Sequence, residues 1–396
     1  MIERISDLEV KYVNDVLKSQ FSTSAGARYM KALEQKFADR FNSPFSISFV
    51  NGTATMHAAL EAMGLSPGDE VIVPPLTMAS TAFAVLQCNA TPIFADVDPL
   101  TFQICTKSIS ERITPRTKAI ITVALYGGAP DMTKIRTICD SNDLFLLEDN
   151  AECFLGEIDN KLIGSFGDFA SFSFQSSKHI TSGEGGMLLV KSKDLANKVR
   201  AVQSLGYIGV SSDKAKITKD DIQNPEYSRH GQLGWNYRMP ELCCAVALGQ
   251  LERIDELVNV RVVAAKRFSA VADNYPDVIT PQLNLPNSKN SYWCWSAVLR
   301  EDINWIDFRR IYNRAGGKPF YSAWKLTYLE PMFAGRHFLG REKFVGSQQL
   351  DSYRPGLCPV AESLQPRMIQ IPTNFWCGDD AAPSINALGE ACKHFQ

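Results

Sequence analysis

The chain has 396 residues, of which 45% are hydrophobic and 21% are charged, and it contains 25 glycines and 20 prolines. This composition is typical of a globular protein with one large and one smaller domain, and it excludes a disordered, collagenous or coiled-coil chain. A formal net charge of −2 leaves no overall basic field, so we expect no nucleic-acid partner.

The amino terminus and the cysteines both indicate a cytoplasmic protein. No apolar run approaches the roughly 20 residues of a membrane span, and the first residues lack the basic and then apolar order of a signal peptide. The 10 cysteines form no C-x-x-C pair and have no histidine at ligand spacing. We therefore expect free thiols in a reducing compartment, no metal site and no membrane partner.

The first helix is expected at about residues 7–19. No clear strand follows it before residue 45, so it packs either on the second domain or on a partner chain. From there to about residue 205, short β-rich runs alternate with helical patterns, which is typical of βα units around a largely parallel sheet. The expected strands are 45–50, 70–73, 92–96, 119–125, 144–148, 170–174 and 187–190, and the expected helices between them are 53–63, 79–88, 132–141 and 194–204.

A long apolar periodicity from Pro240 to about Tyr275 predicts one helix that joins two domains, with the boundary near residue 250. The pattern then changes to a strand at 292–299, a helix at 305–315 and an irregular aromatic and proline-rich stretch at 319–376. We therefore predict an α/β protein. Residues 1–250 form a large domain with a mostly parallel seven-stranded sheet between helices, and residues 251–396 form a smaller α+β domain.

The common nucleotide and hydrolase motifs are missing. The glycine-rich run at 183–186 is not G-x-G-x-x-G and precedes a strand, and Gly317-Lys318 lacks the pattern of a P-loop. The sequence has neither a G-x-S-x-G elbow nor an H-E-x-x-H zinc motif. These absences argue against a Rossmann oxidoreductase and a P-loop enzyme.

Three other segments carry candidate chemistry at the ends of expected strands. Gly52 and Thr53 begin a helix, where free backbone N–H groups can hold a phosphate. Asp149 ends an apolar strand at the edge where ligands bind in α/β sheets. Lys178 follows the strand at 170–174, where a desolvated amine can act as a nucleophile.

Each of these segments alone has an ordinary explanation, as a helix cap, a turn or a surface lysine. Together they supply a phosphate cradle, an aspartate able to pair with a pyridinium nitrogen and a lysine able to bind an aldehyde. Those are the requirements of pyridoxal phosphate chemistry, so the combination is far more specific than its parts.

Further blocks of the sequence occur in the order of one known family and cover almost the whole chain. They are 51–54 (NGTA), 71–74 (VIVP), 92–98 (PIFADVD), 148–152 (EDNAE), 171–174 (SFSF), 178–186 (KHITSGEGG), 234–239 (GWNYRM) and 358–362 (CPVAE). With these blocks the chain resembles the sugar aminotransferases of the DegT/DnrJ/EryC1/StrS group. The resemblance implies the aspartate aminotransferase-like fold type I and the cofactor pyridoxal 5'-phosphate, which becomes pyridoxamine 5'-phosphate during turnover.

The resemblance also implies a role for each matching residue. Lys178 binds the cofactor covalently and moves protons, and Asp149 keeps the ring nitrogen of the cofactor protonated. The other implied cofactor contacts are Gly52, Thr53 and Ser173 at the phosphate, Glu152 beside the ring, and Asn236, which crosses a dimer interface to the phosphate of the neighbouring subunit. The active sites are therefore expected to be shared within a homodimer.

Two positions depart from the family pattern or exclude one of its branches. Met78 stands where the family often has an aromatic residue that stacks on the cofactor ring, and a thioether can cover a ring face instead. One subgroup replaces the lysine by histidine and performs dehydration. Lys178 stands at that position here and His179 follows it, so we reject the dehydration chemistry.

The implied reaction transfers an amino group from an amino acid, with L-glutamate as the expected donor, to a nucleotide-linked keto-deoxyhexose. A 4-keto acceptor is favoured over a 3-keto one. Such a product serves a surface polysaccharide such as the lipopolysaccharide O-antigen, or a natural product. The alternatives are a keto-cyclitol or keto-sugar phosphate acceptor, and a non-catalytic regulator on the same fold. Retention of Lys178, Asp149 and Ser173 argues against the regulator.

Three residues are candidates for substrate contacts, each with a structural alternative. Arg238 either binds a donor carboxylate or a phosphate, or forms an ion pair with a surface acid. Tyr321 and Trp324 lie in the aromatic stretch at 320–328, which either lines the sugar or nucleotide pocket or forms the core of the smaller domain.

Overall fold

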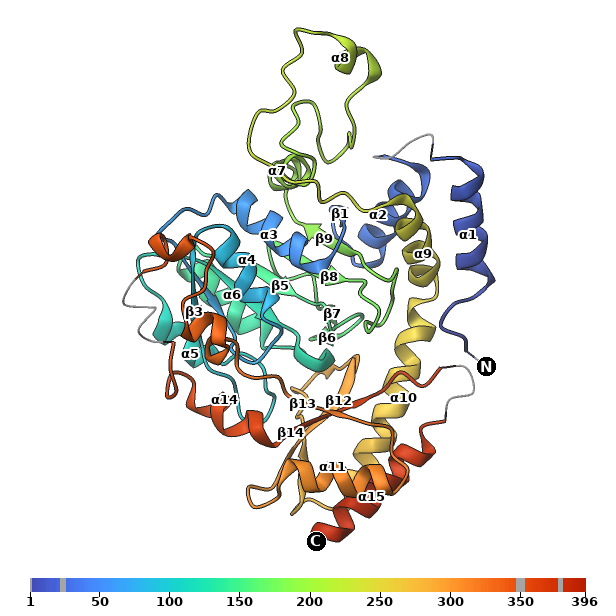
Figure 1. Cartoon of the computed structure of the whole chain (residues 1–396), viewed down its shortest axis with the longest axis vertical. Helices are drawn as coiled ribbons and strands as arrows, with labels where there is room; N and C mark the ends of the chain where they lie inside the picture. The colour runs from blue at the N-terminus through green and yellow to red at the C-terminus, as the bar shows by residue number, and fades with distance from the viewer. Residues whose placement is uncertain (1, 22–25, 347–352, 377–379) are drawn as a thin grey trace.

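The computed structural model describes residues 2–21, 26–346, 353–376 and 380–396. Its centre is a seven-stranded sheet (Figure 1). The strand order is β1-β9-β8-β5-β4-β2-β3. Strands β2, β3, β4, β5 and β8 run parallel, while β9 is antiparallel to both of its neighbours. The strands are β1 (Phe45–Phe49), β2 (Glu70–Val73), β3 (Thr91–Phe94), β4 (Thr117–Val123), β5 (Phe145–Asp149), β8 (Phe169–Ser173) and β9 (Gly186–Val190). The predicted mostly parallel α/β sheet is confirmed.

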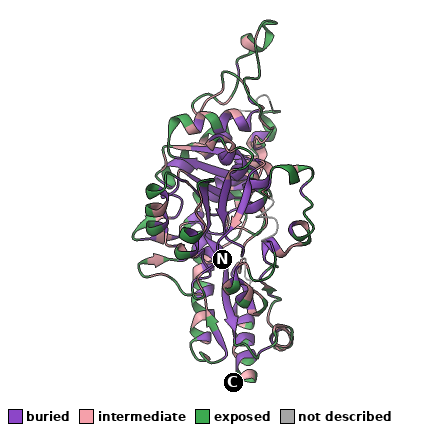
Figure 2. Cartoon of the chain, turned by 90° about the vertical axis from the view of Figure 1, so that its left-hand side faces the viewer, coloured by how far each residue is buried: buried purple, intermediate pink, exposed green. Residues whose placement is uncertain are grey.

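Helices cover both faces of this sheet because alternate residues of each strand point to opposite sides. In β2, Val71 and Val73 join the apolar cluster under α3 and α4, whereas Ile72 joins the cluster under α5 and α6. Figure 2 shows the strands as the most continuously buried part of the chain. The covering helices are α3 (Gly52–Met63), α4 (Ser80–Gln87), α5 (Thr106–Arg112), α6 (Met132–Ser141) and α7 (Lys193–Gln203).

The first helix, α1 (Asp7–Lys18), packs on α9 (Glu241–Glu252), beside α2 (Arg28–Arg40). The buried Glu9 carboxylate accepts hydrogen bonds from Gln250 Nε2 at 2.5 Å and from Arg253 Nη1 at 3.3 Å. The structure thus places α1 against α9, which spans the predicted boundary at residue 250, whereas the sequence left the second domain or a partner chain as the choice. Helix α2 was not predicted.

The predicted single helix from Pro240 to Tyr275 is wrong. The structure contains two helices, α9 and α10 (Ile254–Ala272), separated at Arg253, whose φ of −113° and ψ of 13° are not helical. The side chain of Arg253 turns back to the carbonyl oxygens of Glu3 and Arg4, which ties the break to the amino terminus. An apolar periodicity does not reveal such a break, because it continues on both sides.

Helix α10 leads into a second sheet with the order β10-β12-β14-β13. Its strands are β10 (Ile279–Pro281), β12 (Cys294–Leu299), β13 (Tyr321–Ser322) and β14 (Met368–Pro372), and it packs with α10, α11 (Trp305–Arg314) and α15 (Ala382–Phe395). The expected strand and helix at 292–299 and 305–315 correspond to β12 and α11. Strand β14 and helix α15 were not predicted.

The stretch predicted as irregular contains short elements that lie along the large sheet. Buried side chains of this stretch, among them Tyr328, Phe333 and Cys358, join the same apolar cluster as the large-sheet residue Phe94. The elements are η2 (Thr327–Leu329), α12 (Pro331–Ala334), η3 (Arg341–Lys343), α14 (Pro359–Leu364) and η4 (Gln365–Arg367). The division into residues 1–250 and 251–396 stays a prediction.

The remaining elements lie outside the two main sheets. A small sheet joins β6 (Glu157–Ile158), β7 (Lys161–Leu162) and β11 (Ser288–Lys289), η1 (Leu125–Gly127) follows β4, and α8 (Lys219–Gln223) lies on an excursion that projects from the body in Figure 1. In the described part of the chain, no helix is both long enough and apolar enough to cross a membrane.

Candidate active site

The candidate residues gather at one edge of the large sheet. Asp149 is the last residue of β5, Ser173 is the last residue of β8, and Gly52 begins α3 directly after β1. Because β5 and β8 are parallel neighbours, their carboxyl ends lie side by side. This is the edge where open α/β sheets bind ligands, as the sequence analysis expects.

Asp149 is buried, and each of its carboxylate oxygens can accept a further hydrogen bond. Its Oδ2 accepts a hydrogen bond from Thr81 Oγ1 at 2.9 Å, and its Oδ1 accepts one from the Ala151 backbone N–H at 3.2 Å. Burial raises the pKa of this carboxyl group, and these two hydrogen bonds oppose the rise. A carboxylate in this state is suited to a cationic N–H donor. Thr81 carries no motif in the sequence and was missed.

The amine of Lys178 lies between an acid and an aromatic ring. Its Nζ is 3.3 Å from Glu152 Oε1 and 4.5 Å from the centre of the Trp293 ring. The other oxygen of Glu152 accepts a hydrogen bond from the Tyr126 backbone N–H at 3.1 Å, which fixes the orientation of the carboxylate. Trp293 precedes β12, and the sequence analysis missed it because no motif links it to Lys178.

The start of α3 forms a narrow cradle against β8. Asn51 caps the helix by accepting a hydrogen bond from the Ala54 N–H at 2.8 Å, and the first N–H groups of a helix, which have no partner within it, can receive an anion. A Cβ added at Gly52 would lie 3.0 Å from Ser173 Cβ, so the close approach of the two elements favours glycine. Thr53 is half-buried at the same helix end.

A small cavity of about 10 Å³, open to solvent, lies beside Glu152, the partner of Lys178. It is lined by Met78, Trp324, Glu152 and Trp293, together with Tyr126 and Gln370. Met78 and Trp324 are about half exposed, and the lining does not include Tyr321, which is 65% exposed on β13. Of the two aromatic substrate candidates, the structure therefore places Trp324 at the cavity.

Asn236 and Arg238 lie on an extended segment beside β1. Asn236 is exposed and bridges to Ser204 through the backbone, and Arg238 bridges to Phe49. Arg238 Nη1 is buried, and in the described part of the chain it has no hydrogen-bond partner. The carboxylate or phosphate role of Arg238 and the role of Asn236 at a partner subunit stay predictions.

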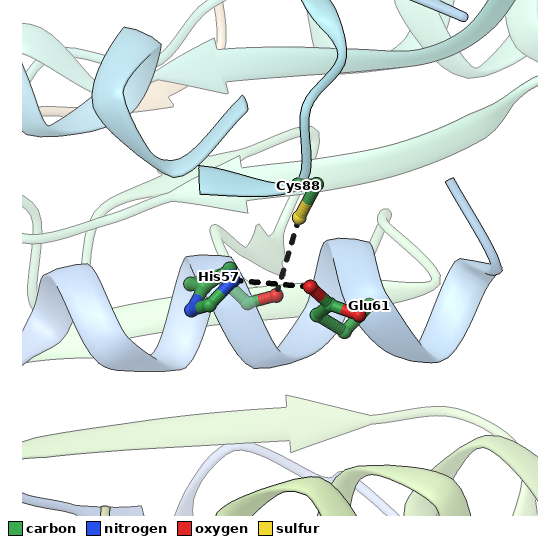
Figure 3. Close-up of side chains that lie close together, drawn as sticks. All are labelled: His57, Glu61 and Cys88. Carbon is green, nitrogen blue, oxygen red and sulfur yellow. Dashed lines mark hydrogen bonds and ion pairs between the residues drawn. The ribbon is translucent and has the colours of Figure 1, made fainter. Parts of the chain in front are cut away.

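One further group of ligand-type side chains lies away from this edge (Figure 3). His57 Nε2 is 3.2 Å from Glu61 Oε1, His57 Nδ1 is 3.0 Å from the Tyr237 hydroxyl, and Cys88 Sγ donates to the His57 carbonyl at 3.9 Å. Burial raises the pKa of the Cys88 thiol, which disfavours the thiolate that a metal needs. Each group has a protein partner, so we interpret the cluster as core packing. The expected absence of a metal site stays a prediction.

The residues at the sheet edge fit pyridoxal phosphate. The buried carboxylate of Asp149 suits a protonated ring nitrogen, the free N–H groups beside Gly52 suit a phosphate, and Lys178 supplies the amine. An α/β sheet that presents these groups along one edge defines a pyridoxal-phosphate enzyme of fold type I.

Comparisons with known proteins give the same class. A model of the DegT/DnrJ/EryC1/StrS aminotransferase family matches residues 3–385. The chain is 36% identical over 296 residues to the GDP-perosamine synthase of Escherichia coli O157:H7, covering 74% of this chain and 75% of that protein. It is 31% identical over 380 residues to the L-glutamine:2-deoxy-scyllo-inosose aminotransferase of Micromonospora echinospora, covering 93% and 88% of the two chains.

The fold agrees with a solved structure as well. The X-ray structure of the aminotransferase from Psychrobacter cryohalolentis matches with a TM-score of 0.85 at 24% identity and covers 97% of this chain and 96% of that chain. The chain belongs to the DegT/DnrJ/EryC1/StrS aminotransferase family. It is a transaminase that uses pyridoxal phosphate, which confirms the enzyme class and the cofactor predicted from the sequence.

Proposed function

We propose that this enzyme transfers an amino group from L-glutamate to a nucleotide-linked keto-deoxyhexose, with a 4-keto acceptor favoured over a 3-keto one. The observation that carries the proposal is that the buried Asp149 carboxylate and the Lys178 amine, which is paired with Glu152, lie near the same sheet edge. The acceptor class rests on the family and on the likeness to a GDP-perosamine synthase. The aromatic lining of the cavity by Trp293 and Trp324 suits the apolar face of a sugar ring.

The residues have separate tasks in this reaction. When bound, pyridoxal phosphate supplies the electron sink for the carbanion of the amino acid. Lys178 Nζ takes the proton from the amino-acid carbon and returns it during the transfer, while Glu152 holds the amine in place. Asp149 holds a proton on the ring nitrogen, and the free N–H groups at the start of α3 bind the phosphate.

A second acceptor class is supported by one observation. The relative from Micromonospora echinospora matches over 93% of this chain, and its name gives a keto-cyclitol as acceptor and glutamine as donor. A keto-cyclitol acceptor is therefore the second candidate, with glutamine as the alternative donor.

Two further parts of the proposal concern the assembly and the setting of the enzyme. We propose a homodimer in which Asn236 of each subunit reaches the cofactor phosphate of the other. The exposure of Asn236 supports this role. A cytoplasmic setting and a role in surface-polysaccharide or natural-product synthesis also belong to the proposal, and the free thiols of the nine described cysteines are compatible with a reducing compartment.

The test begins with the absorbance spectrum of the purified protein with pyridoxal phosphate, before and after glutamate is added. We expect a band of lysine-bound cofactor that glutamate converts to the pyridoxamine form, and no such band in Lys178→Ala. A Lys178→Ala protein with an unchanged band would refute the role of Lys178.

The acceptor is then identified with the pyridoxamine form of the enzyme. A GDP-linked 4-keto-6-deoxyhexose, its 3-keto isomer and a keto-inositol are added separately, and recovery of the original band is timed. The proposal expects the fastest recovery with the nucleotide-linked 4-keto sugar. Faster recovery with the keto-inositol would favour the second candidate instead.

A further inference from the structure

Arg261, in the middle of α10, is a buried cation whose partners are three backbone carbonyl groups and the Thr373 hydroxyl, which accepts from Nη1 at 3.4 Å. It is 1% exposed. Its Nη2 donates to the carbonyl oxygens of Ser177 at 2.9 Å and Lys178 at 3.1 Å, and its Nη1 donates to the carbonyl oxygen of Trp293 at 2.6 Å. In the described part of the chain, no carboxylate is among its partners. Burial, together with the nearby charge of Arg4, lowers the pKa of Arg261 to about 9.

The backbone carbonyl groups of Ser177 and Lys178 also accept hydrogen bonds from two other side chains. Arg4 Nη2 donates to the Lys178 carbonyl at 3.1 Å, and the indole N–H of Trp293 donates to the Ser177 carbonyl at 2.9 Å. Arg4 and Arg261 also both approach the Trp376 ring, at 5.8 Å and 5.6 Å from its centre. The Lys178 carbonyl therefore accepts hydrogen bonds from two guanidinium groups that share one aromatic ring.

This arrangement matters because the backbone at Lys178 is the base of a long and flexible side chain. The amine lies beside Glu152 and the Trp293 ring, and the position of that ring depends on the backbone at Trp293. Arg261 contacts the backbone on both sides of this amine, at Lys178 and at Trp293. Burying a guanidinium without a carboxylate is unfavourable, so its presence here calls for a function.

We propose that Arg261 is a positioning residue that fixes where the Lys178 amine lies between Glu152 and Trp293. The inference rests on the proposed role of Lys178. The planar fork of Arg261 holds two segments at once, one after β8 and one before β12, and a lysine at this position has no such fork. Arg261 thus joins the loop of the reactive amine to the sheet of the C-terminal part of the chain.

The test compares Arg261→Lys and Arg261→Gln with the wild-type holoenzyme. Three quantities are measured: the single-turnover rate with glutamate, the apparent glutamate dissociation constant, and the pH midpoint of the lysine-bound cofactor band. We expect Arg261→Lys to slow the single turnover by about 10²-fold, the effect of misplacing a reacting group by about 1 Å, with little change in the dissociation constant. In Arg261→Gln the band midpoint should rise, because removal of a nearby cation favours the protonated form.

Arg200→Lys is the matched control. Arg200 is also 1% exposed, but it pairs with Glu34, away from Lys178. It should lower thermal stability and leave the turnover rate and the band midpoint unchanged. If the Arg261 variants fail to fold, Arg4→Met removes the second donor to the Lys178 carbonyl from a half-buried position and should change the rate in the same direction.

A wild-type turnover rate in Arg261→Lys or a wild-type band midpoint in Arg261→Gln would overturn the proposal, as would equal changes in Arg200→Lys. In the Arg4→Met variant, an unchanged rate would have the same consequence. A Lys178→Ala protein that keeps the cofactor band would instead refute the role of Lys178 and would leave the Arg261 contacts without a catalytic meaning. The two failures are therefore distinguishable.

Discussion

Asp149 and Lys178 lie at one sheet edge, but only Lys178 has an oppositely charged side chain as a hydrogen-bond partner. The Lys178 amine has the Glu152 carboxylate at 3.3 Å, whereas the hydrogen bonds of Asp149 come from the neutral donors Thr81 and Ala151. Burial therefore dominates at Asp149 and raises its pKa. A protonated ring nitrogen would supply the missing positive charge, so this site is built for a ligand rather than for the stability of the cofactor-free fold.

The first residue-scale prediction concerns activity. Asp149→Asn should slow the half-reaction with glutamate by about 10²-fold, because an amide cannot hold the ring nitrogen protonated and one preorganised electrostatic contact is lost. The rate is measured in single turnovers from the cofactor absorbance. Thr81→Val is the control, since it removes only the hydrogen bond to Asp149 and should have the smaller effect.

The same variant makes a second prediction, for the stability of the cofactor-free protein. A carboxyl group whose pKa is raised by folding favours the folded state most below its unfolded pKa of about 3.9, and that contribution is lost as the pH rises through the folded value. At pH values above the folded pKa of Asp149, Asp149→Asn should therefore raise the melting temperature. Near pH 4 the substitution should have less effect. A lower melting temperature at pH 8 would contradict the effect of burial argued for Asp149.

At the scale of elements, the contact between α3 and β8 determines the shape of the proposed phosphate site. The hydroxyls of Thr55 and Ser171 are 2.5 Å apart, and Gly52 faces Ser173 just beyond them. This side-by-side packing aims the start of a 12-residue helix at the sheet edge. The helix end can then receive a phosphate without any charged side chain.

Gly52→Ala should weaken binding of pyridoxal phosphate by about tenfold, corresponding to roughly one hydrogen bond to a charged group. The reason is that the new methyl group would push α3 away from Ser173, which lies 3.0 Å from its position. The dissociation constant is measured by absorbance titration. Gly389→Ala in α15 is the control, since its methyl group meets its nearest neighbour at an ordinary 3.6 Å and should leave the affinity unchanged.

At the scale of the whole molecule, the C-terminal half of the chain returns to the large sheet. The Asp96 carboxylate, shortly after β3, accepts hydrogen bonds from the backbone N–H groups of Val360 and Ala361 at 2.9 Å each, which caps α14. Tyr353 donates to the Pro92 carbonyl at 2.6 Å. These contacts hold residues 353–361 against β3 and the residues that follow it.

The proposed dimer makes a prediction at the same scale. If Asn236 serves the neighbouring subunit, co-expression of Lys178→Ala with Asn236→Ala should restore about a quarter of wild-type activity, because half of the dimers are mixed and each has one intact site. Activity is measured on tagged, purified mixtures. The control is Lys178→Ala with Asp149→Asn, which should restore none, since one subunit supplies both residues to a site. Absence of restoration in the first mixture would contradict the shared site.

The large sheet and the nearness of Asp149 and Lys178 were predictable from the sequence. Apolar runs define all seven strands, and the carboxyl ends of parallel strands share one edge, so Asp149 and Lys178 had to lie near each other. The family blocks then supplied the roles of Gly52 and Ser173. These inferences depend on local patterns and on the geometry of a parallel sheet, and both are readable along the chain.

Only the tertiary structure revealed the other features. Arg261 and Trp293 contact the backbone at residues 177–178 from positions more than 80 residues away, and Thr81 reaches Asp149 across 68 residues. The break at Arg253 depends on carbonyl groups at the amino terminus. The sequence by itself determined the sheet and the residues at its edge, because hydrophobic period and strand direction are local. The packing of distant segments decided what surrounds the amine, because side-chain contacts of that kind leave no periodic signal in the sequence.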